Sequence, residues 1–303
     1  MFSILIPSYN NLNYLDLCIK SIKKNSKYNH QIIVHINEGT DGSLEYVKKN
    51  NIHHTYTEQN VGMPKALNMA SRLAEKKYIV ISHDDFYYCP DWDQEFLNEL
   101  NLIKHNMFYL SGTMVHYSED VSNYVKAQPP VFNAGKTIEE FNETKLLKNL
   151  NKIKTINFQG TTKHPALIHK SIWDEVGGWS EEFSPTGGDD SDFVMKLWKK
   201  NIRIFKGLGN CSVYHFGSIT TRKKKNSYTY LGSRGNKIFL KKWKIGINFF
   251  EKFYLRSGLD RNKKLIFNEY DGPLKEPKKN LSYFYELFIN KLNIFYLILI
   301  NFK

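Results

Sequence analysis

The chain has 303 residues, 41% of them hydrophobic and 15% aromatic, a composition that predicts a folded body and excludes an intrinsically disordered chain. The formal net charge of +13 is unevenly placed, because residues 222–303 hold 19 Lys and Arg against 6 Asp and Glu, whereas residues 1–221 are balanced. A balanced body argues against nucleic-acid binding by that part. The basic end favours partners that carry phosphate, such as anionic lipid, nucleic acid or a diphosphate leaving group.

Strand and helix signals alternate from the start of the chain. Residues 2–7 form an apolar run that stops at Pro7, as a buried parallel strand would. Apolar residues then recur at helical spacing from Leu12 to Ile22. Residues 31–36 form a second apolar run and end in a segment rich in turn residues. These signals predict a strand, a helix and a second strand.

The alternation continues. A short helix is expected around Leu44 and Val47, and a third helix near Pro64, which suits a first helical turn. Residues 78–82 are a further apolar strand that runs directly into two acids. Strands and helices alternating at this spacing predict an α/β fold with a Rossmann-like, doubly wound, mostly parallel sheet.

Three polar segments follow these strands, at residues 7–10, 37–42 and 83–85. In a doubly wound sheet, ligands bind at the carboxyl ends of the strands. The sequence therefore predicts that these segments meet at one ligand site.

The second half begins with a polar, weakly periodic region. It is expected to contain, in order, a helix over 138–150, a strand over 165–170, a helix over 189–200, and two strands over 202–205 and 211–215.

Asp84 and Asp85 directly follow an apolar strand, so both side chains should emerge where a ligand would lie. Carboxylate oxygens are ligands that Mg²⁺ and Mn²⁺ accept, and such a cation can bridge a protein to a diphosphate. The alternative is structural, because two acids at a strand end also suit a polar turn.

A second acidic group, Asp189, Asp190 and Asp192, starts a helix behind two glycines. One carboxylate there could act as a general base toward an acceptor hydroxyl. Acids at a helix start also complement the helix dipole, so a structural role stays open. His215 lies at the end of an expected strand, and two roles stay open for it, as a metal ligand or as a packed residue.

Taken in order, these segments resemble the family 2 glycosyltransferases, an inverting group with the GT-A fold. The resemblance covers roughly residues 2–220 and rests on "SILIPSYN", "IIVHINEGTDGSLEYV", "NVGMPKALNMA", "ISHDDFYYCPDW", "VGGWSEEF", "GGDDSDFVMKLWKK" and "VYHFGS". It implies a metal-dependent transfer of a sugar from a nucleotide-sugar, expected to be a UDP-sugar. The acceptor is expected to be a hydroxyl of a glycan or lipid-linked glycan, and the cation Mn²⁺ or Mg²⁺.

On the donor side, the resemblance assigns roles position by position. Pro7, Ser8 and Tyr9 match the nucleotide-contacting turn. Asn37 or Glu38 matches the acid that reads the nucleotide base.

The family's arginine in the third motif is replaced by Leu67, so Lys65 is the candidate for that charge. The first acid of the family's D-x-D motif is replaced by Ser82, unless the register shifts onto Asp84 and Asp85.

At the reaction centre, the resemblance makes Asp190 the catalytic base, with Asp189 in place of the motif's glutamate. Asp85 is the expected metal ligand, while Asp84 would hold the ribose or share the metal. His215 would reach the metal or the diphosphate. The replaced motif residues keep an alternative open, a sugar-nucleotide-binding protein without catalysis. A second alternative is a nucleic-acid-binding protein that acts through the basic end.

Residues 1–221 are expected to form the GT-A domain, with a nucleotide-sugar part at 1–113 and an acceptor part at 114–221. Residues 222–303 are expected to be a basic, aromatic-rich helical extension. Its end is mostly apolar with a narrow polar stripe, and its longest apolar run is shorter than the ~20 residues that cross a bilayer. We expect this end either to bind a membrane surface or to dock on the body or a partner subunit.

The three cysteines, Cys18, Cys89 and Cys211, are scattered and odd in number, and the sequence begins without a basic leader. Both features favour a cytoplasmic protein, peripheral to the inner face of a membrane if the extension binds lipid.

Overall fold

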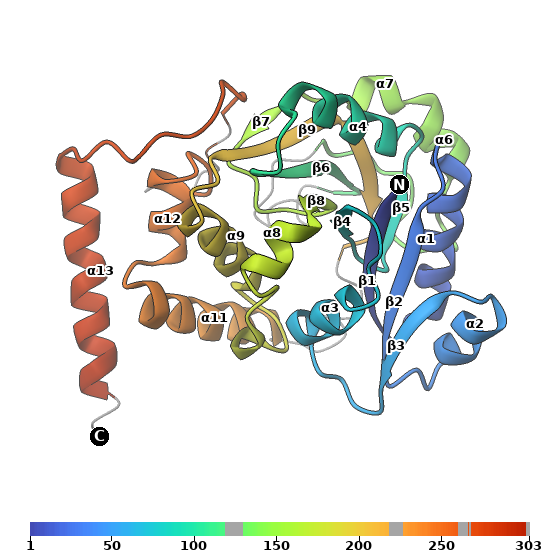
Figure 1. Cartoon of the computed structure of the whole chain (residues 1–303), viewed down its shortest axis with the longest axis horizontal. Helices are drawn as coiled ribbons and strands as arrows, with labels where there is room; N and C mark the ends of the chain where they lie inside the picture. The colour runs from blue at the N-terminus through green and yellow to red at the C-terminus, as the bar shows by residue number, and fades with distance from the viewer. Residues whose placement is uncertain (119–129, 218–226, 260–265, 267, 301–303) are drawn as a thin grey trace.

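The computed structural model describes residues 1–118, 130–217, 227–259, 266 and 268–300 (Figure 1). The strands are β1 (Phe2–Tyr9), β2 (Gln31–Asn37), β3 (His53–Thr57), β4 (Tyr78–Ile81), β5 (Phe86–Tyr88), β6 (Phe108–His116), β7 (Phe158–Gln159), β8 (Ala166–His169) and β9 (Ile204–His215). The helices are α1 (Leu12–Asn25), α2 (Ser43–Lys49), α3 (Met63–Ser71), α4 (Trp92–Ile103), α6 (Glu143–Lys148), α7 (Leu150–Ile153), α8 (Lys170–Glu175), the 3₁₀ turn η1 (Glu181–Phe183), α9 (Asp189–Lys199), α11 (Ser227–Trp243), α12 (Ile247–Phe253) and α13 (Leu281–Ile300).

The strands form one sheet in the order β3-β2-β1-β4-β8-β6-β9-β5, with β7 paired to β9. The first four strands of this order are mutually parallel, and β6 is parallel to β9. β8 runs antiparallel between β4 and β6, and β5 runs antiparallel to β9. The predicted α/β fold is confirmed, and its parallel half carries the strand ends that were expected to bind the ligand.

Helices cover both faces of the sheet (Figure 1). On one face, α1 and α4 bury side chains that include Leu15 and Phe96. On the other, α3, α8 and α9 bury Leu67, Ile172 and Phe193. Because the strands alternate their side chains between these two cores, the sheet is doubly wound.

β9 is one continuous strand where the sequence suggested two. Within it, a Cβ on Gly207 would lie 2.0 Å from the Phe158 ring, and a Cβ on Gly209 would lie 1.9 Å from the Thr155 carbonyl oxygen. The glycines therefore mark a close approach of other chain segments, not a break in the strand.

The helix expected over 138–150 is replaced by two short helices, α6 and α7. The Asn142 side chain accepts a hydrogen bond from the Lys145 amide at 2.8 Å, which starts α6 later than expected. β6 was also missed, although it is buried along its length, because Ser111 and Thr113 interrupt its apolar run.

The predicted helical extension is present as α11, α12 and α13 (Figure 1). The boundary expected at residues 221–222 lies outside the described residues. Among the helices that the structure describes, none combines the length and apolar character needed to span a membrane.

Helix α11 of the C-terminal extension packs against the loop that leads into α9. A Cβ on Gly235 of α11 would lie 1.8 Å from the carbonyl oxygen of Gly187 and 3.1 Å from the amide nitrogen of Gly188. The Arg234 guanidinium donates to the Glu182 carbonyl at 2.9 Å. This part of α11 is therefore in direct contact with the start of the second acidic motif.

We expect Gly235→Ala to destabilise the protein. In a helix interior this change ordinarily stabilises by up to about 1 kcal/mol. Here the added methyl group meets backbone atoms, so the free energy of unfolding should fall by about 1–3 kcal/mol. Urea unfolding measures the change, and Ser233→Ala, at an exposed position of the same helix, is the control. A Gly235→Ala protein as stable as the parent would contradict the close approach.

Candidate active site

Asp84 and Asp85 are buried in the segment between β4 and β5. Ser8, at the carboxyl end of the adjacent β1, donates a hydrogen bond to Asp84 Oδ2 at 2.8 Å. Burial disfavours the charged form of Asp84 and the neighbouring Asp85 adds repulsion, so the pKa of Asp84 rises to about 7. The structure places both acids at the edge of the sheet where the parallel strands end.

Asp85 faces His215. The antiparallel pairing of β5 with β9 sets Phe86 opposite His215, and the Asp85 Oδ2 atom lies 3.3 Å from His215 Nε2. The two candidate metal ligands therefore lie together and offer one oxygen and one nitrogen. Within the described residues, no group of three or more His, Cys, Asp and Glu side chains is arranged to hold a metal ion.

Two of the three acids at the start of α9 are buried and hydrogen-bonded within the protein. Asp192 is fully buried, and its Oδ1 atom accepts from Trp243 Nε1 at 2.7 Å and lies 3.0 Å from Lys242 Nζ. Asp189 is buried and accepts from the Gly187 amide at 2.9 Å. Burial, followed by the charge of the next residue, raises the pKa of Asp189 to about 7.

Asp190 is the acid of this group that stays open, with 27% of its side chain exposed. Its Oδ1 atom accepts from the Ser191 amide at 2.8 Å, and its Oδ2 atom lies 3.6 Å from Lys163 Nζ. The neighbouring Ser191 hydroxyl donates to Glu251 of α12 at 3.0 Å. Asp190 is therefore oriented by the amide of the next residue, and part of its side chain stays exposed.

A pair of histidines lies between the two acidic groups. His83 Nε2 is 2.9 Å from His164 Nδ1, and His164 directly follows Lys163, the partner of Asp190. Burial lowers the pKa of His83 to about 4, while both Asp85 and Asp190 act to raise it. The histidine pair, together with the contact of Lys163 with Asp190, therefore links the two acidic groups.

This histidine pair was not predicted from the sequence. His83 immediately precedes the two acids, which was a usable signal, but nothing in the sequence pattern marks His164. His164 is 6% exposed, and its Nε2 atom has no hydrogen-bond partner among the described residues. A buried imidazole nitrogen of this kind is able to bind a ligand atom.

Of the two residues predicted to recognise the nucleotide base, Glu38 is more exposed than Asn37. Asn37 is 3% exposed, donates to the Ser8 carbonyl at 3.3 Å and accepts from the Val61 amide at 2.9 Å. Glu38 accepts from the Asn10 side chain at 3.2 Å. Burial and the nearby Glu38 carboxylate raise the pKa of the Tyr9 hydroxyl, so Tyr9 and Glu38 lie close together.

The remaining donor-side candidates lie near the same edge. Pro7 is in β1, opposite His35 of β2. Lys65 is exposed in the first turn of α3, two residues after Met63, whose amide donates to the Pro185 carbonyl at 2.8 Å. The start of α3 therefore touches the loop that leads into α9, and Lys65 lies near this contact.

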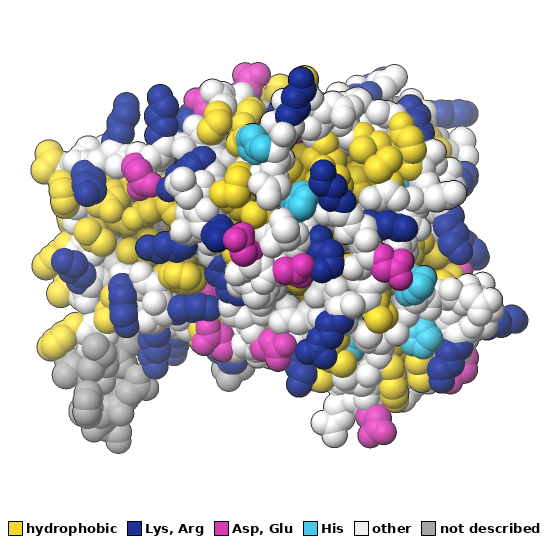
Figure 2. Space-filling view, viewed as in Figure 1, with side chains coloured by type: hydrophobic (Ala, Val, Ile, Leu, Met, Phe, Trp, Pro, Cys, Tyr) yellow, Lys and Arg dark blue, Asp and Glu magenta, His cyan; other side chains and the backbone are white. Residues whose placement is uncertain are grey.

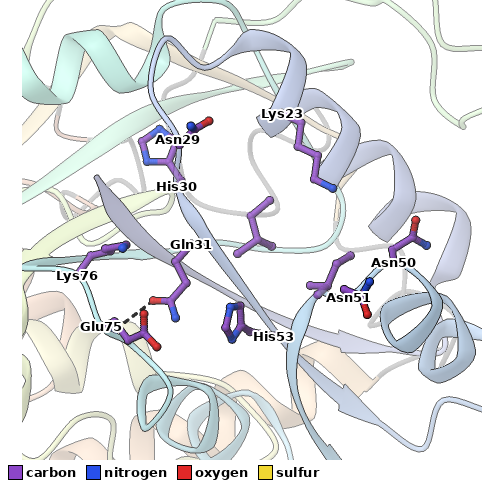
Figure 3. Close-up of a pocket in the computed structure, with 11 residues that line it drawn as sticks. Lys23, Asn29, His30, Gln31, Asn50, Asn51, His53, Glu75 and Lys76 are labelled. Carbon is purple, nitrogen blue, oxygen red and sulfur yellow. Dashed lines mark hydrogen bonds between the residues drawn. The ribbon is translucent and has the colours of Figure 1, made fainter.

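A cavity of about 350 Å³ lies at the opposite edge of the sheet (Figure 3). It is lined by residues at the amino ends of β2 and β3, including Gln31 and His53, and by Lys23 and Lys76. Its lining contains none of the candidate site residues. This cavity is therefore separate from the acids described above.

Residues 3–177 match the family model described as Glycosyl transferase family 2. An uncharacterized glycosyltransferase from Rickettsia bellii is 32% identical over 120 residues, which cover 37% of this chain and 17% of that protein. The match thus spans less than a fifth of the relative's length.

Two solved structures show the same fold. S. aureus TarS residues 1–349 in complex with UDP is 14% identical, with a TM-score of 0.51 over 80% of this chain and 72% of that one. GalNAc-T7 with UDP, GalNAc and Mn²⁺ is 14% identical, with a TM-score of 0.52 over 71% of this chain and 43% of that one.

We expect Asp84→Asn to stabilise the protein at alkaline pH. The pKa of Asp84 is about 7 in the folded chain and about 3.9 when unfolded, so stability is lost as the pH rises between these values. The substitution removes the buried charge, and should raise the free energy of unfolding by about 1–3 kcal/mol near pH 8 and hardly at all below about pH 4. Urea unfolding across this pH range measures the difference.

Asp93→Asn is the matched control. Asp93 is also buried, but its carboxylate accepts hydrogen bonds from the Lys27 and Tyr28 amides at 2.9 and 3.0 Å. Its replacement should therefore destabilise the protein at the same alkaline pH. If Asp84→Asn also destabilises there, the raised pKa of Asp84 is refuted.

Proposed function

Because this chain belongs to glycosyl transferase family 2, we propose that it is a metal-dependent, inverting glycosyltransferase that moves a hexosyl group from a UDP-sugar to a hydroxyl of a glycan or lipid-linked glycan. The observation that carries the proposal is that acids far apart in the sequence are linked by short contacts. Asp85 lies 3.3 Å from His215, and the adjacent histidine pair described above leads to Lys163, which lies 3.6 Å from Asp190. The fold relatives support the donor class, since TarS was solved with UDP and GalNAc-T7 with UDP and Mn²⁺.

The proposed setting is polysaccharide biosynthesis in the cytoplasm. Cys18, Cys89 and Cys211 are buried free thiols, as expected for a reducing compartment. Donor nucleotide-sugars carry a diphosphate, which the basic surplus of the chain also favours.

Asp190 is the proposed catalytic base. In the bound complex the acceptor hydroxyl would donate a hydrogen bond to the Asp190 carboxylate, which takes the proton as the acceptor oxygen attacks the anomeric carbon. Attack from the face opposite the nucleotide breaks the bond to the diphosphate and inverts the configuration. The partial exposure of Asp190, against the burial of Asp189 and Asp192, supports this assignment.

Asp85 and His215 would hold the Mn²⁺ or Mg²⁺ ion. Their carboxylate oxygen and imidazole nitrogen suit Mn²⁺ well, and the other coordination positions would fall to diphosphate oxygens and water. When bound, the cation neutralises the negative charge that develops on the leaving diphosphate. Asp84, held by Ser8, would contact the ribose or share the cation.

Tyr9 and Glu38 would contact the nucleotide base, with Pro7 and Ser8 shaping the turn beneath it. Asn37 would position the turn and would not contact the base itself, because its side-chain amide is hydrogen-bonded to the Ser8 carbonyl and the Val61 amide. Lys65 would supply positive charge toward the phosphates from the first turn of α3.

We expect Asp190→Asn to lower kcat roughly 10²–10⁴-fold, because an amide cannot accept the proton of the acceptor hydroxyl. The affinity for UDP should change little, since Asp190 lies on the acceptor side. Nucleotide release from a panel of UDP-sugars with Mn²⁺ and acceptor measures kcat, and calorimetry measures UDP affinity. Asp174→Asn, an exposed acid paired with Lys170, is the control and should leave both unchanged. An active Asp190→Asn enzyme would refute the assignment of the base.

We expect Asp85→Asn and His215→Ala each to abolish the gain in UDP affinity that Mn²⁺ confers on the parent protein. The reason is that each removes one of the two protein ligands proposed for the cation. Calorimetric titration of UDP with and without Mn²⁺ measures this gain. His105→Ala, at an exposed site, should keep it. If both site variants retained the full gain, the cation would have to bind elsewhere.

A further inference from the structure

Helix α13 docks on the body through its polar edge. The Glu286 carboxylate lies 2.6 Å from Lys252 Nζ of α12, and Asn290 Oδ1 accepts from the Gly246 amide at 2.5 Å. Tyr283, 7% exposed, packs against the aromatic side chains of α12. Glu286 and Asn290, two of the three residues of the narrow polar stripe, therefore face the protein, while the third, Asn293, is exposed.

The opposite face of α13 is apolar and exposed. Six large side chains on this face are between 47% and 63% exposed, and we call them the α13 stripe: Phe284, Tyr285, Phe288, Leu292, Phe295 and Tyr296. A helix at a protein surface ordinarily turns its apolar side inward. A continuous exposed apolar stripe of this kind marks a surface that another phase or molecule covers.

Positive charge accompanies the stripe. Lys278 and Lys279 lie two to three residues before the start of α13, Lys291 lies within it, and all three are exposed. None of the three forms an ion pair with any residue that the structure describes. Figure 2 shows the result at the edge formed by α13, where hydrophobic side chains alternate with Lys and Arg.

The apolar stripe and its neighbouring lysines together distinguish between two partners that could cover this surface, a second copy of the chain and a lipid bilayer. A second copy of the chain would bring together two C-terminal segments that each carry 19 Lys and Arg against 6 Asp and Glu, which repel each other. An anionic lipid surface attracts the lysines and accepts Phe and Tyr at the boundary of headgroups and acyl chains. Because the polar edge of α13 is already docked, its exposed apolar side can lie flat on such a surface.

We propose that the α13 stripe binds the surface of an anionic phospholipid bilayer. α12 links this surface to the candidate active site, since Lys252 holds α13 while the adjacent Glu251 holds Ser191 beside Asp190. This consequence rests on the proposed function, and it would bring the base near a lipid-linked acceptor. The binding itself does not depend on sugar transfer.

Flotation of the full chain with vesicles tests the surface. The parent protein should float with vesicles of phosphatidylcholine and phosphatidylglycerol, and not with vesicles of phosphatidylcholine alone. The triple variant Phe284→Ser, Phe288→Ser and Phe295→Ser should lower the partition coefficient on the order of a hundredfold, because three aromatic side chains no longer leave water. All three positions are exposed, so circular dichroism should show an unchanged fold.

The control triple variant is Tyr28→Ser, Tyr56→Ser and Leu102→Ser, which removes exposed apolar side chains elsewhere and should float like the parent. Equal loss in both triple variants, or a parent protein that binds neither kind of vesicle, would overturn the proposal. If the parent protein sedimented as a dimer and bound no vesicles, and only the α13 triple variant sedimented as a monomer, the stripe would be assigned to a second copy of the chain. Vesicle binding without any sugar transfer would leave this inference intact and remove the proposed function.

Discussion

The candidate site depends on two adjacent carboxylates that the fold keeps buried at the end of β4. Asp84 and Asp85 repel each other and have little access to water, an arrangement that opposes folding unless other groups offset it. Ser8 and His215 each contact one of them and come from separate strands. A cation bound here together with a diphosphate would relieve this repulsion. The electrostatically unfavourable pair of carboxylates therefore lies where the metal-dependent chemistry is proposed.

Much of this arrangement could be predicted from the sequence, because it follows from local rules. Apolar runs define β1, β2 and β4, and parallel strands end at one edge, so Ser8, Glu38 and Asp84 had to be near one another. The start of α9 at Asp189 also follows from its two preceding glycines. The contact between His83 and His164 could not be predicted, because it depends on how β8 and its preceding loop pack beside β4.

The C-terminal helix illustrates a second limit. The pattern of α13 shows one polar and one apolar side, but the pattern alone does not say which side meets the protein. Glu286 contacts the ammonium group of Lys252 on α12, and Asn290 accepts from the amide of Gly246 just before α12; these contacts decide the orientation. A surface helix usually turns its apolar side inward, but α13 leaves its apolar side exposed. An exposed apolar side of this kind in a folded chain indicates a surface that binds another molecule or a membrane.

We propose that acids remote in the sequence surround one cation and one diphosphate. Anomalous diffraction at the manganese edge, from a crystal of the full chain with Mn²⁺ and UDP, tests it most directly. We expect one manganese peak between Asp85 and His215, in contact with the UDP diphosphate, and Asp190 on the side where the sugar would lie. A manganese peak away from both residues, or UDP bound with Asp190 remote from its diphosphate, would contradict it.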